Sequence, residues 1–179
     1  FYRGGWCPYC NLGLREWQRL LPQIKAKGAT LVAVSPQTPD NSLSTAQKSA
    51  LEFTVLSDST LEAARGFGVL FDMSPELVAL YQGMGNDLPL INGNGRWALP
   101  VPATYVVGKG GVVTYAHIDA DYSQRAEPAQ VLAAFAGVYS SLDFAAFAVG
   151  PFGIRRRAGF VPASAAALER PLSLLPPDI

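Results

Sequence analysis

Trp6-Cys7-Pro8-Tyr9-Cys10 stands at the head of a helical pattern near the start of the sequence. From Pro8 to Lys27, apolar residues recur at spacings of three and four, which predicts a helix with one buried face. Pro8 suits the first turn of such a helix, and Gly28 suits the position just past its end. The sequence therefore places the two cysteines on the opening turn of a helix.

Short apolar runs alternate with helical patterns through the first half of the chain. The expected elements are a strand at 30–34, a helix at 40–52, a strand at 54–56 and a helix ending near Gly66. We expect Leu43, Ala46 and Ala50 to face the core from the second helix. Ser59 and Glu62 have the spacing of a capping box at the start of the third helix. This alternation predicts an α/β fold with a largely parallel sheet and helices on its faces.

The next part of the chain has the pattern of an inserted helix and a long loop. Ser74-Pro75-Glu76 is a helix start, and Gly85 suits its end. We expect one side of this helix to carry Leu77, Leu80, Tyr81 and Met84. The segment 86–100 is rich in Asn, Gly and Pro, and we expect a functional loop without secondary structure that covers the cysteines.

The closing elements are a β-hairpin and a helix. Apolar runs at 103–107 and 112–118 flank Gly108-Lys109-Gly110-Gly111, whose glycines suit a turn with positive φ. The period at 128–139 predicts a final helix that packs across the sheet. The pattern degrades beyond residue 140, so we expect one domain at 1–140 and a loosely ordered or disordered tail at 141–179.

Composition limits the class of protein and its location. The 179 residues are 49% hydrophobic and carry 14 basic and 14 acidic side chains, which suits a globular domain and favours neither nucleic acid nor a membrane as partner. Phe1 already lies in what resembles the end of a strand, so we expect the N-terminal part of the domain to be missing. The two cysteines are three positions apart, which argues against a secreted disulfide framework and for a reducing, cytoplasmic location.

The cysteine pair has the placement of a redox site. Unpaired N–H groups and the macrodipole at a helix N-terminus stabilise a thiolate. In Cys-x-x-Cys settings the thiol pKa falls from about 8.5 to roughly 3.5–7.5. Cys7 and Cys10 are also close enough to form a disulfide. The alternative is a zinc half-site, but tetrahedral zinc needs four ligands and only His117 and carboxylates remain, so we expect no metal and no cofactor.

Four segments carry a family resemblance: Phe1-Tyr2-Arg3-Gly4-Gly5-Trp6-Cys7-Pro8-Tyr9-Cys10, Leu31-Val32-Ala33-Val34-Ser35, Leu56-Ser57-Asp58 and Pro102-Ala103-Thr104-Tyr105-Val106-Val107. In this order they resemble the peroxiredoxin-like branch of the alkyl hydroperoxide reductase and thiol-specific antioxidant (AhpC/TSA) family over residues 1–139. The resemblance implies a thioredoxin-like fold, with a central mixed β-sheet flanked by helices. It also implies reduction of hydroperoxides or disulfides by thiols.

The resemblance leaves open which cysteine attacks the substrate. Peroxiredoxins have a Thr-x-x-Cys motif at this turn. The resemblance to that motif would make Cys10 the attacking residue and put Cys7 in place of the threonine. This chain has Pro102 where peroxiredoxins place an arginine and where thioredoxins have a cis-proline, and the thioredoxin pattern would make Cys7 the attacking residue. Arg3 is positioned to polarise a peroxide or stabilise a thiolate, or else it is a strand-end arginine paired elsewhere.

Other residues complete the predicted site. We expect Trp6 to shield the thiols or to be core, with Pro8 and Tyr9 beside it. Arg125 approaches the site from another loop or, in the blander alternative, pairs with Asp119 or Asp121.

The leading hypothesis is a peroxiredoxin-like, thiol-dependent oxidoreductase that cycles Cys7 and Cys10 between dithiol and disulfide. Its substrate would be a hydroperoxide or a protein disulfide, and thioredoxin or glutathione would reduce it. A homodimer is a further expectation. The alternatives are a thioredoxin-like disulfide reductase without peroxidase activity and a redox-inactive binding module.

Overall fold

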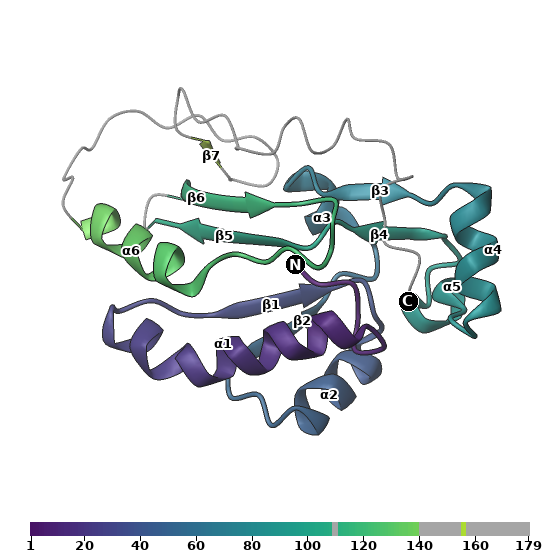
Figure 1. The fold of residues 1–179 in the computed structure, drawn as a ribbon, viewed down its shortest axis with the longest axis horizontal. Helices are drawn as coiled ribbons and strands as arrows, with labels where there is room; N and C mark the ends of the chain where they lie inside the picture. Colours follow the sequence, from purple (N-terminus) through teal and green to yellow (C-terminus); the bar gives the residue numbers. More distant parts are fainter. Residues whose placement is uncertain (109–110, 140–154, 157–179) are drawn as a thin grey trace. The chain divides into compact units, whose positions relative to one another are not determined.

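The computed structural model describes residues 1–108, 111–139 and 155–156 (Figure 1). The chain divides into two compact units, Phe1–Pro102 and Ala103–Ile179. The first unit contains α1 to α5 and β1 to β4, and the second contains β5 to β7 and α6. Among the described helices, none combines the length and the apolar character that crossing a membrane requires.

The predicted first helix is present as α1, Pro8–Ala26. Pro8 occupies its first turn, and Cys7 is its N-cap residue. The strands β1, Val32–Ser35, and β2, Thr54–Ser57, follow as predicted and pair in parallel. The buried face of α1 and the strand β1 share one cluster made of Tyr2, Cys7, Cys10, Leu14, Leu21, Ala33 and Phe53. The cysteine pair is therefore part of the packed core of the first unit.

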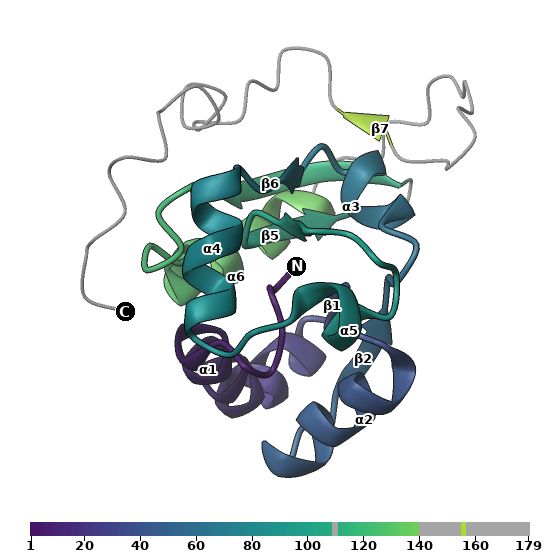
Figure 2. The same cartoon turned by 90° about the vertical axis from the view of Figure 1, so that its right-hand side faces the viewer.

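The second helix, α2, Pro39–Lys48, lies against β2 (Figure 2). Its inward face is polar, contrary to prediction. Ser42 and Thr45 are buried, whereas Leu43 is 58% exposed. The physical reason is the partner of this face, because a Cβ at Gly5 would collide with the hydroxyl of Thr45. Such a close backbone approach leaves room only for small polar side chains. The expected inward position of Ala50 is also wrong, because this residue is exposed beyond the helix end with φ of 48°.

The third helix, α3, Glu62–Gly66, ends where the sequence predicts but begins differently. Its N-cap residue is Leu61, without a side-chain hydrogen bond, so the capping box of Ser59 and Glu62 is wrong. The carboxylate of Asp58 instead accepts hydrogen bonds from the N–H groups of Ala63 at 3.0 Å and Ala64 at 2.8 Å. Two free N–H groups of the first turn are satisfied from just outside the helix.

The predicted inserted helix is α4, Pro75–Gly83, capped by Ser74. Tyr81 is buried on it, but Leu80 and Met84 are 51% and 41% exposed, so the predicted apolar side is only partly buried. The segment 86–100 is not the expected structureless loop. It contains α5, Leu88–Asn92, and β4, Ala98–Pro100, which pairs antiparallel with β3, Leu70–Asp72.

The second unit contains the predicted hairpin and final helix. The strands β5, Ala103–Val107, and β6, Val112–Ile118, are antiparallel, with an irregularity between Val106 and Val107. Helix α6, Pro128–Tyr139, packs on both strands, and Gly111 has the positive φ expected of the turn. A short strand, β7, Arg155–Arg156, pairs in parallel with β6. The rest of the predicted tail lies outside the described residues, and the α/β prediction is confirmed.

Candidate active site

Cys7 and Cys10 meet at the first turn of α1, as predicted. Cys7 is the N-cap residue, and its Sγ accepts a hydrogen bond from the backbone N–H of Cys10 at 3.4 Å. Both cysteines are free thiols, and both are buried, with exposed fractions of 0% for Cys7 and 3% for Cys10. The pair is thus enclosed by protein but in contact with a hydrogen-bond donor of the helix terminus.

Arg3 lies beside the pair and supplies a fixed positive charge. Its Nη2 donates to the Sγ of Cys7 at 3.1 Å, and its side chain is buried. Burial alone would lower the pKa of Arg3, but attraction to Cys7, Tyr81 and Cys10 outweighs burial and raises the pKa above its usual value. Arg3 therefore remains a cation next to the sulfur atoms, and it is buried rather than a surface arginine.

Aromatic side chains enclose the guanidinium of Arg3. The Nη1 of Arg3 donates to the hydroxyl of Tyr81 at 2.6 Å, and its central carbon lies 5.4 Å from the ring centre of Trp6. The rings of Trp6 and Tyr81 meet edge to face with centres 5.6 Å apart. Trp6 packs on the cluster that contains the cysteines and on a second cluster formed by Tyr81, Leu88 and Leu99. It therefore combines the two roles that the sequence left open.

The pKa of the Cys7 thiol is raised, whereas a helix N-terminus is expected to lower it. The pKa of Cys7 is raised first because the thiol hydrogen-bonds to the side chain of Cys10, then because it is buried and because it is repelled by charge on Cys10. Arg3 and the backbone N–H of Cys10 oppose this shift and lower the pKa, but they are outweighed. When two thiols interact this strongly, the first negative charge suppresses the second. The pair consequently favours a state with a single negative charge.

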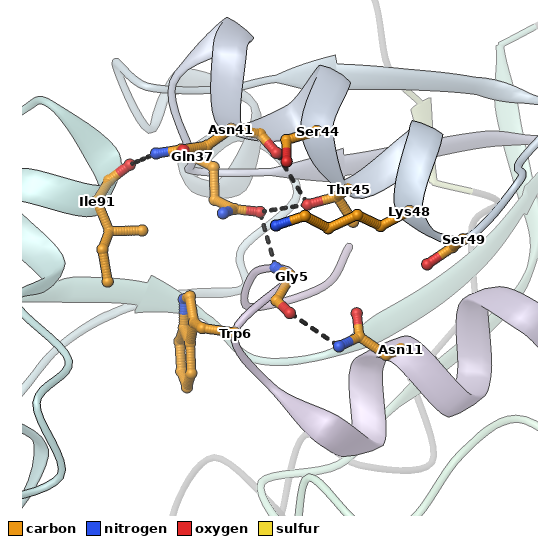
Figure 3. A pocket seen from close by; sticks show the side chains of 10 residues that line it. All are labelled: Gly5, Trp6, Asn11, Gln37, Asn41, Ser44, Thr45, Lys48, Ser49 and Ile91. Carbon is orange, nitrogen blue, oxygen red and sulfur yellow. Dashed lines mark hydrogen bonds between the residues drawn. The ribbon is translucent and has the colours of Figure 1, made fainter.

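The segment before Cys7 is fixed to the residues around α2 (Figure 3). The N–H of Gly5 donates to the Oε1 of Gln37 at 2.8 Å, and the carbonyl of Gly5 accepts from the Nδ2 of Asn11 at 2.8 Å. The hydroxyl of Thr45 lies 3.4 Å from the Oε1 of Gln37 and donates to the backbone carbonyl of Asn41 at the shorter distance of 2.9 Å. These bonds set the position from which the chain enters α1.

The remaining predicted site residues fall in different places. Pro8 is exposed at the start of α1, and Tyr9 packs against the cysteine cluster. Pro102 is buried after β4, and its peptide bond is trans, because the described residues include no cis peptide; the cis-proline of thioredoxins is therefore not reproduced at this position.

Arg125 belongs to the second unit, so its approach to the cysteines stays a prediction. The pKa of Asp121 is lowered mainly by hydrogen bonds with Ser123 and partly by attraction to Arg125, in keeping with the blander alternative for this arginine.

Sequence reasoning missed Tyr81, Gln37 and Thr45. Tyr81 was assigned to an apolar helix side, and only its hydroxyl signalled a polar contact. Gln37 and Thr45 lie 27 and 35 positions after Cys10, and no local pattern connects them with the cysteines. Across the part of the chain that the structure describes, no group of three His, Cys, Asp or Glu side chains is arranged to hold a metal ion.

The first unit and the hairpin match a known family. A model of the AhpC/TSA family matches residues 1–116. Among solved structures, peroxidoxin BcpB from Mycobacterium tuberculosis is similar, with 16% identity, a TM-score of 0.58, and coverage of 78% of this chain and 77% of that one.

A cysteine-to-serine mutant of peroxiredoxin 6 from Arenicola marina is also similar, with 14% identity, a TM-score of 0.52, and coverage of 73% of this chain and 55% of that one. No curated protein matches the sequence. At such identities the two structures establish a thioredoxin-like fold and nothing more. Because the family model spans well over half of the sequence, the chain belongs to the AhpC/TSA family.

Proposed function

We propose that this chain is a thiol-dependent peroxidase that reduces hydroperoxides through a dithiol and disulfide cycle of Cys7 and Cys10. Membership of the AhpC/TSA family supports thiol peroxidase-type function in general. The observation that carries the specific proposal is the contact of the Arg3 guanidinium with Cys7 Sγ at 3.1 Å. A buried cation against a cysteine pair stabilises a thiolate and the developing charge of a departing oxygen.

In the proposed first step, Cys10 is the attacking thiolate. The raised pKa of Cys7 favours a proton on that sulfur. The proposal therefore places the negative charge on Cys10, to which Arg3 is also attracted. The Cys10 sulfur attacks one oxygen of the hydroperoxide, the O–O bond breaks, and the second oxygen leaves as the alkoxide and takes up a proton. Cys10 becomes a sulfenic acid, and the hydroperoxide is reduced to an alcohol or water.

In the proposed second step, Cys7 resolves the sulfenic acid. Its sulfur displaces the hydroxyl group, which leaves as water, and a disulfide joins Cys7 and Cys10. Two equivalents of thiol then reduce this disulfide and become oxidised in turn. Because the pair is buried, a small thiol such as glutathione reaches it with less opening of the protein than thioredoxin does. The spacing of the two residues across one helical turn supports a direct, intramolecular second step.

Burial favours a hydroperoxide over a protein disulfide as the substrate. A protein disulfide must present its sulfur to an exposed attacking sulfur, whereas Cys7 and Cys10 are 0% and 3% exposed. A hydroperoxide group is small enough to need far less opening of the protein. The rival, a disulfide reductase without peroxidase activity, lacks this support.

The experiment that tests the proposal compares two reactions in three proteins. Stopped-flow mixing with hydrogen peroxide follows thiol oxidation in the parent chain, Cys10→Ser and Cys7→Ser, and insulin reduction is measured beside it. We expect rapid peroxide consumption by the parent, none by Cys10→Ser, and one turnover to a sulfenic acid in Cys7→Ser. Absence of peroxide consumption, together with insulin reduction that is lost in Cys7→Ser, would overturn the proposal in favour of the disulfide reductase.

A further inference from the structure

A pocket lies beside the cysteine turn and takes no part in the chemistry described above. Its volume is about 300 Å³, which is within the range of small-ligand sites. Three parts of the first unit line it: the turn and α1 with Gly5, Trp6 and Asn11, the α2 region from Gln37 to Ser49, and Ile91 of α5 (Figure 3). We call it the α2 pocket.

The α2 pocket is lined by a single charged side chain, which is positive. This side chain is Lys48, which is exposed and extends across the pocket from the last turn of α2 (Figure 3). No salt bridge of Lys48 occurs within the described residues. An ammonium group in a pocket without a carboxylate attracts an anion.

Gln37 adds a hydrogen-bond donor, and the contact with the N–H of Gly5 determines which end of its amide is the donor. The backbone N–H of Gly5 can only donate, so the Gln37 atom 2.8 Å away must be the carbonyl Oε1. The hydroxyl of Thr45 lies 3.4 Å from the same oxygen. The Nε2 of Gln37 is therefore the free end of the amide, and it makes no hydrogen bond within the described part of the chain. The residue is only 5% exposed, but this nitrogen keeps contact with the solvent of the pocket, where it can donate to a ligand or to water.

The rest of the lining supplies neutral polar groups. Ser44 and Ser49 contribute hydroxyls, and Asn11 and Asn41 contribute amides. One positive charge surrounded by neutral donors suits an acceptor with a single negative charge and two oxygens, which describes a carboxylate. A phosphate carries more charge and is typically held by arginine or by free backbone N–H groups. The backbone N–H groups of the lining residues Gly5, Asn11, Asn41, Ser49 and Ile91 already have acceptors within the protein.

We propose that the α2 pocket binds the carboxylate of a small molecule, and that Lys48 and Gln37 are the residues that donate hydrogen bonds to this carboxylate. The role of this binding rests on the proposed function: the carboxylate belongs either to the thiol that reduces the chain or to an acidic hydroperoxide. Because Gly5 and Trp6 both line the pocket and lead directly into Cys7, a ligand held there lies beside the cysteine turn.

Binding is tested without turnover, by NMR titration of the ¹⁵N-labelled reduced chain. The probe is N-acetyl-S-methylcysteine, which cannot react with the thiols, and its uncharged methyl ester is the control ligand. We expect the acid, but not the ester, to shift the side-chain amide resonance of Gln37. Lys48→Met should weaken binding of the acid by about three- to tenfold, as expected for one partly exposed charge. Lys25→Met, which removes a matched lysine from the last turn of α1, should leave binding unchanged.

Equal binding of acid and ester, or equal binding to the parent and Lys48→Met, overturns the proposal. These outcomes do not depend on peroxidase activity, so a chain that fails to consume peroxide refutes the proposed function and leaves the pocket to be judged by the titration.

Kinetics then identify the source of the carboxylate. N-acetylcysteine is compared with its methyl ester as the reductant, and a hydroperoxy fatty acid with its methyl ester as the oxidant. We expect one of the two acids to have a KM about three- to tenfold below that of its ester, and this preference to disappear in Lys48→Met but not in Lys25→Met. A lower KM for N-acetylcysteine than for its ester assigns the pocket to the reductant. A lower KM for the hydroperoxy fatty acid than for its ester assigns the pocket to the hydroperoxide substrate. Preference in neither pair, in a chain that turns over peroxide, overturns the role.

Discussion

The guanidinium of Arg3 donates to the hydroxyl of Tyr81 at 2.6 Å, across 78 positions of sequence. The same guanidinium donates to Cys7 Sγ, so Tyr81 holds the cation that faces the cysteine pair. This bond makes α4, which carries no cysteine, a positioning element for the candidate active site.

The hydroxyl of Tyr81 is tested by Tyr81→Phe, which keeps the ring against Trp6. The change leaves a buried Nη1 of Arg3 without its acceptor, which costs about 1–3 kcal/mol of stability. We expect the rate of thiol oxidation by hydrogen peroxide to fall by about tenfold, because a misplaced guanidinium stabilises the reacting charge less well. Stopped-flow oxidation measures the rate, and Tyr115→Phe in the second unit is the control. An unchanged rate in Tyr81→Phe would show that Arg3 is held by its other contacts.

The raised pKa of Cys7 predicts how stability depends on pH. Between the ordinary thiol pKa of about 8.5 and the raised value, the folded chain holds a proton on Cys7 that the unfolded chain has lost. The contribution of Cys7 to the free energy of unfolding is therefore fully present below about pH 8.5. Above this pH the free energy of unfolding falls, by at most about 1.4 kcal/mol per pH unit for one group.

Urea unfolding of the reduced chain at pH 7.5, 8.5 and 9.5 measures this fall, and Cys7→Ser should make it shallower. Tyr2, whose pKa burial also raises, adds to the fall only above about pH 10. A stability that rises over this range, or a slope unaffected by Cys7→Ser, contradicts the prediction.

The contact between Gly5 and α2 predicts opposite effects for two glycine substitutions. In Gly5→Ala the new Cβ meets the Thr45 hydroxyl, so we expect a loss of about 1–3 kcal/mol and slower peroxide reduction as the cysteine turn moves. In Gly13→Ala no atom lies within 4 Å of the new Cβ, and alanine favours the helix by about 0.5–1 kcal/mol. Thermal and urea unfolding compare the two variants, and equal effects on stability would rule out the close contact.

The start of α3 supplies a test of helix capping. Asp58→Ala removes the acceptor of two N–H groups and should cost about 1–2 kcal/mol. Ser59→Ala should change stability by less than about 0.5 kcal/mol, because Ser59 does not cap the helix. The reverse order in urea unfolding would restore the capping box that the sequence suggests.

The sequence predicts the elements whose signals are local. The spacing of apolar residues after Cys10 is sufficient to predict α1. The alternation of apolar runs and helical patterns up to residue 66 is sufficient to predict β1, β2 and the order of the elements, because each pattern is contained in one element. The position of the cysteines at the start of α1 follows from Pro8 and from that period, so the central residues of the candidate site were accessible from sequence alone.

The misplaced features depend on contacts between distant segments. Leu43 looks like a core residue until Gly5 is packed against Thr45, which excludes large side chains from that face of α2. The strands β3 and β4 are three residues each and depend on each other for their hydrogen bonds, so neither has a pattern of its own. The raised pKa of Cys7 likewise comes from Cys10 and burial, which outweigh the helix terminus that sequence reasoning considered.

The position of the Arg3 guanidinium, 5.4 Å from the ring centre of Trp6, gives the protein an internal optical reporter. Closure of the disulfide removes the negative charge of the cysteine pair that attracts this cation and thereby changes the electric field at the indole. Indole emission is sensitive to such a field, so the reduced and oxidised populations differ in fluorescence without any added dye. A single mixing experiment can then follow the redox state of the pair at the speed of the chemistry itself.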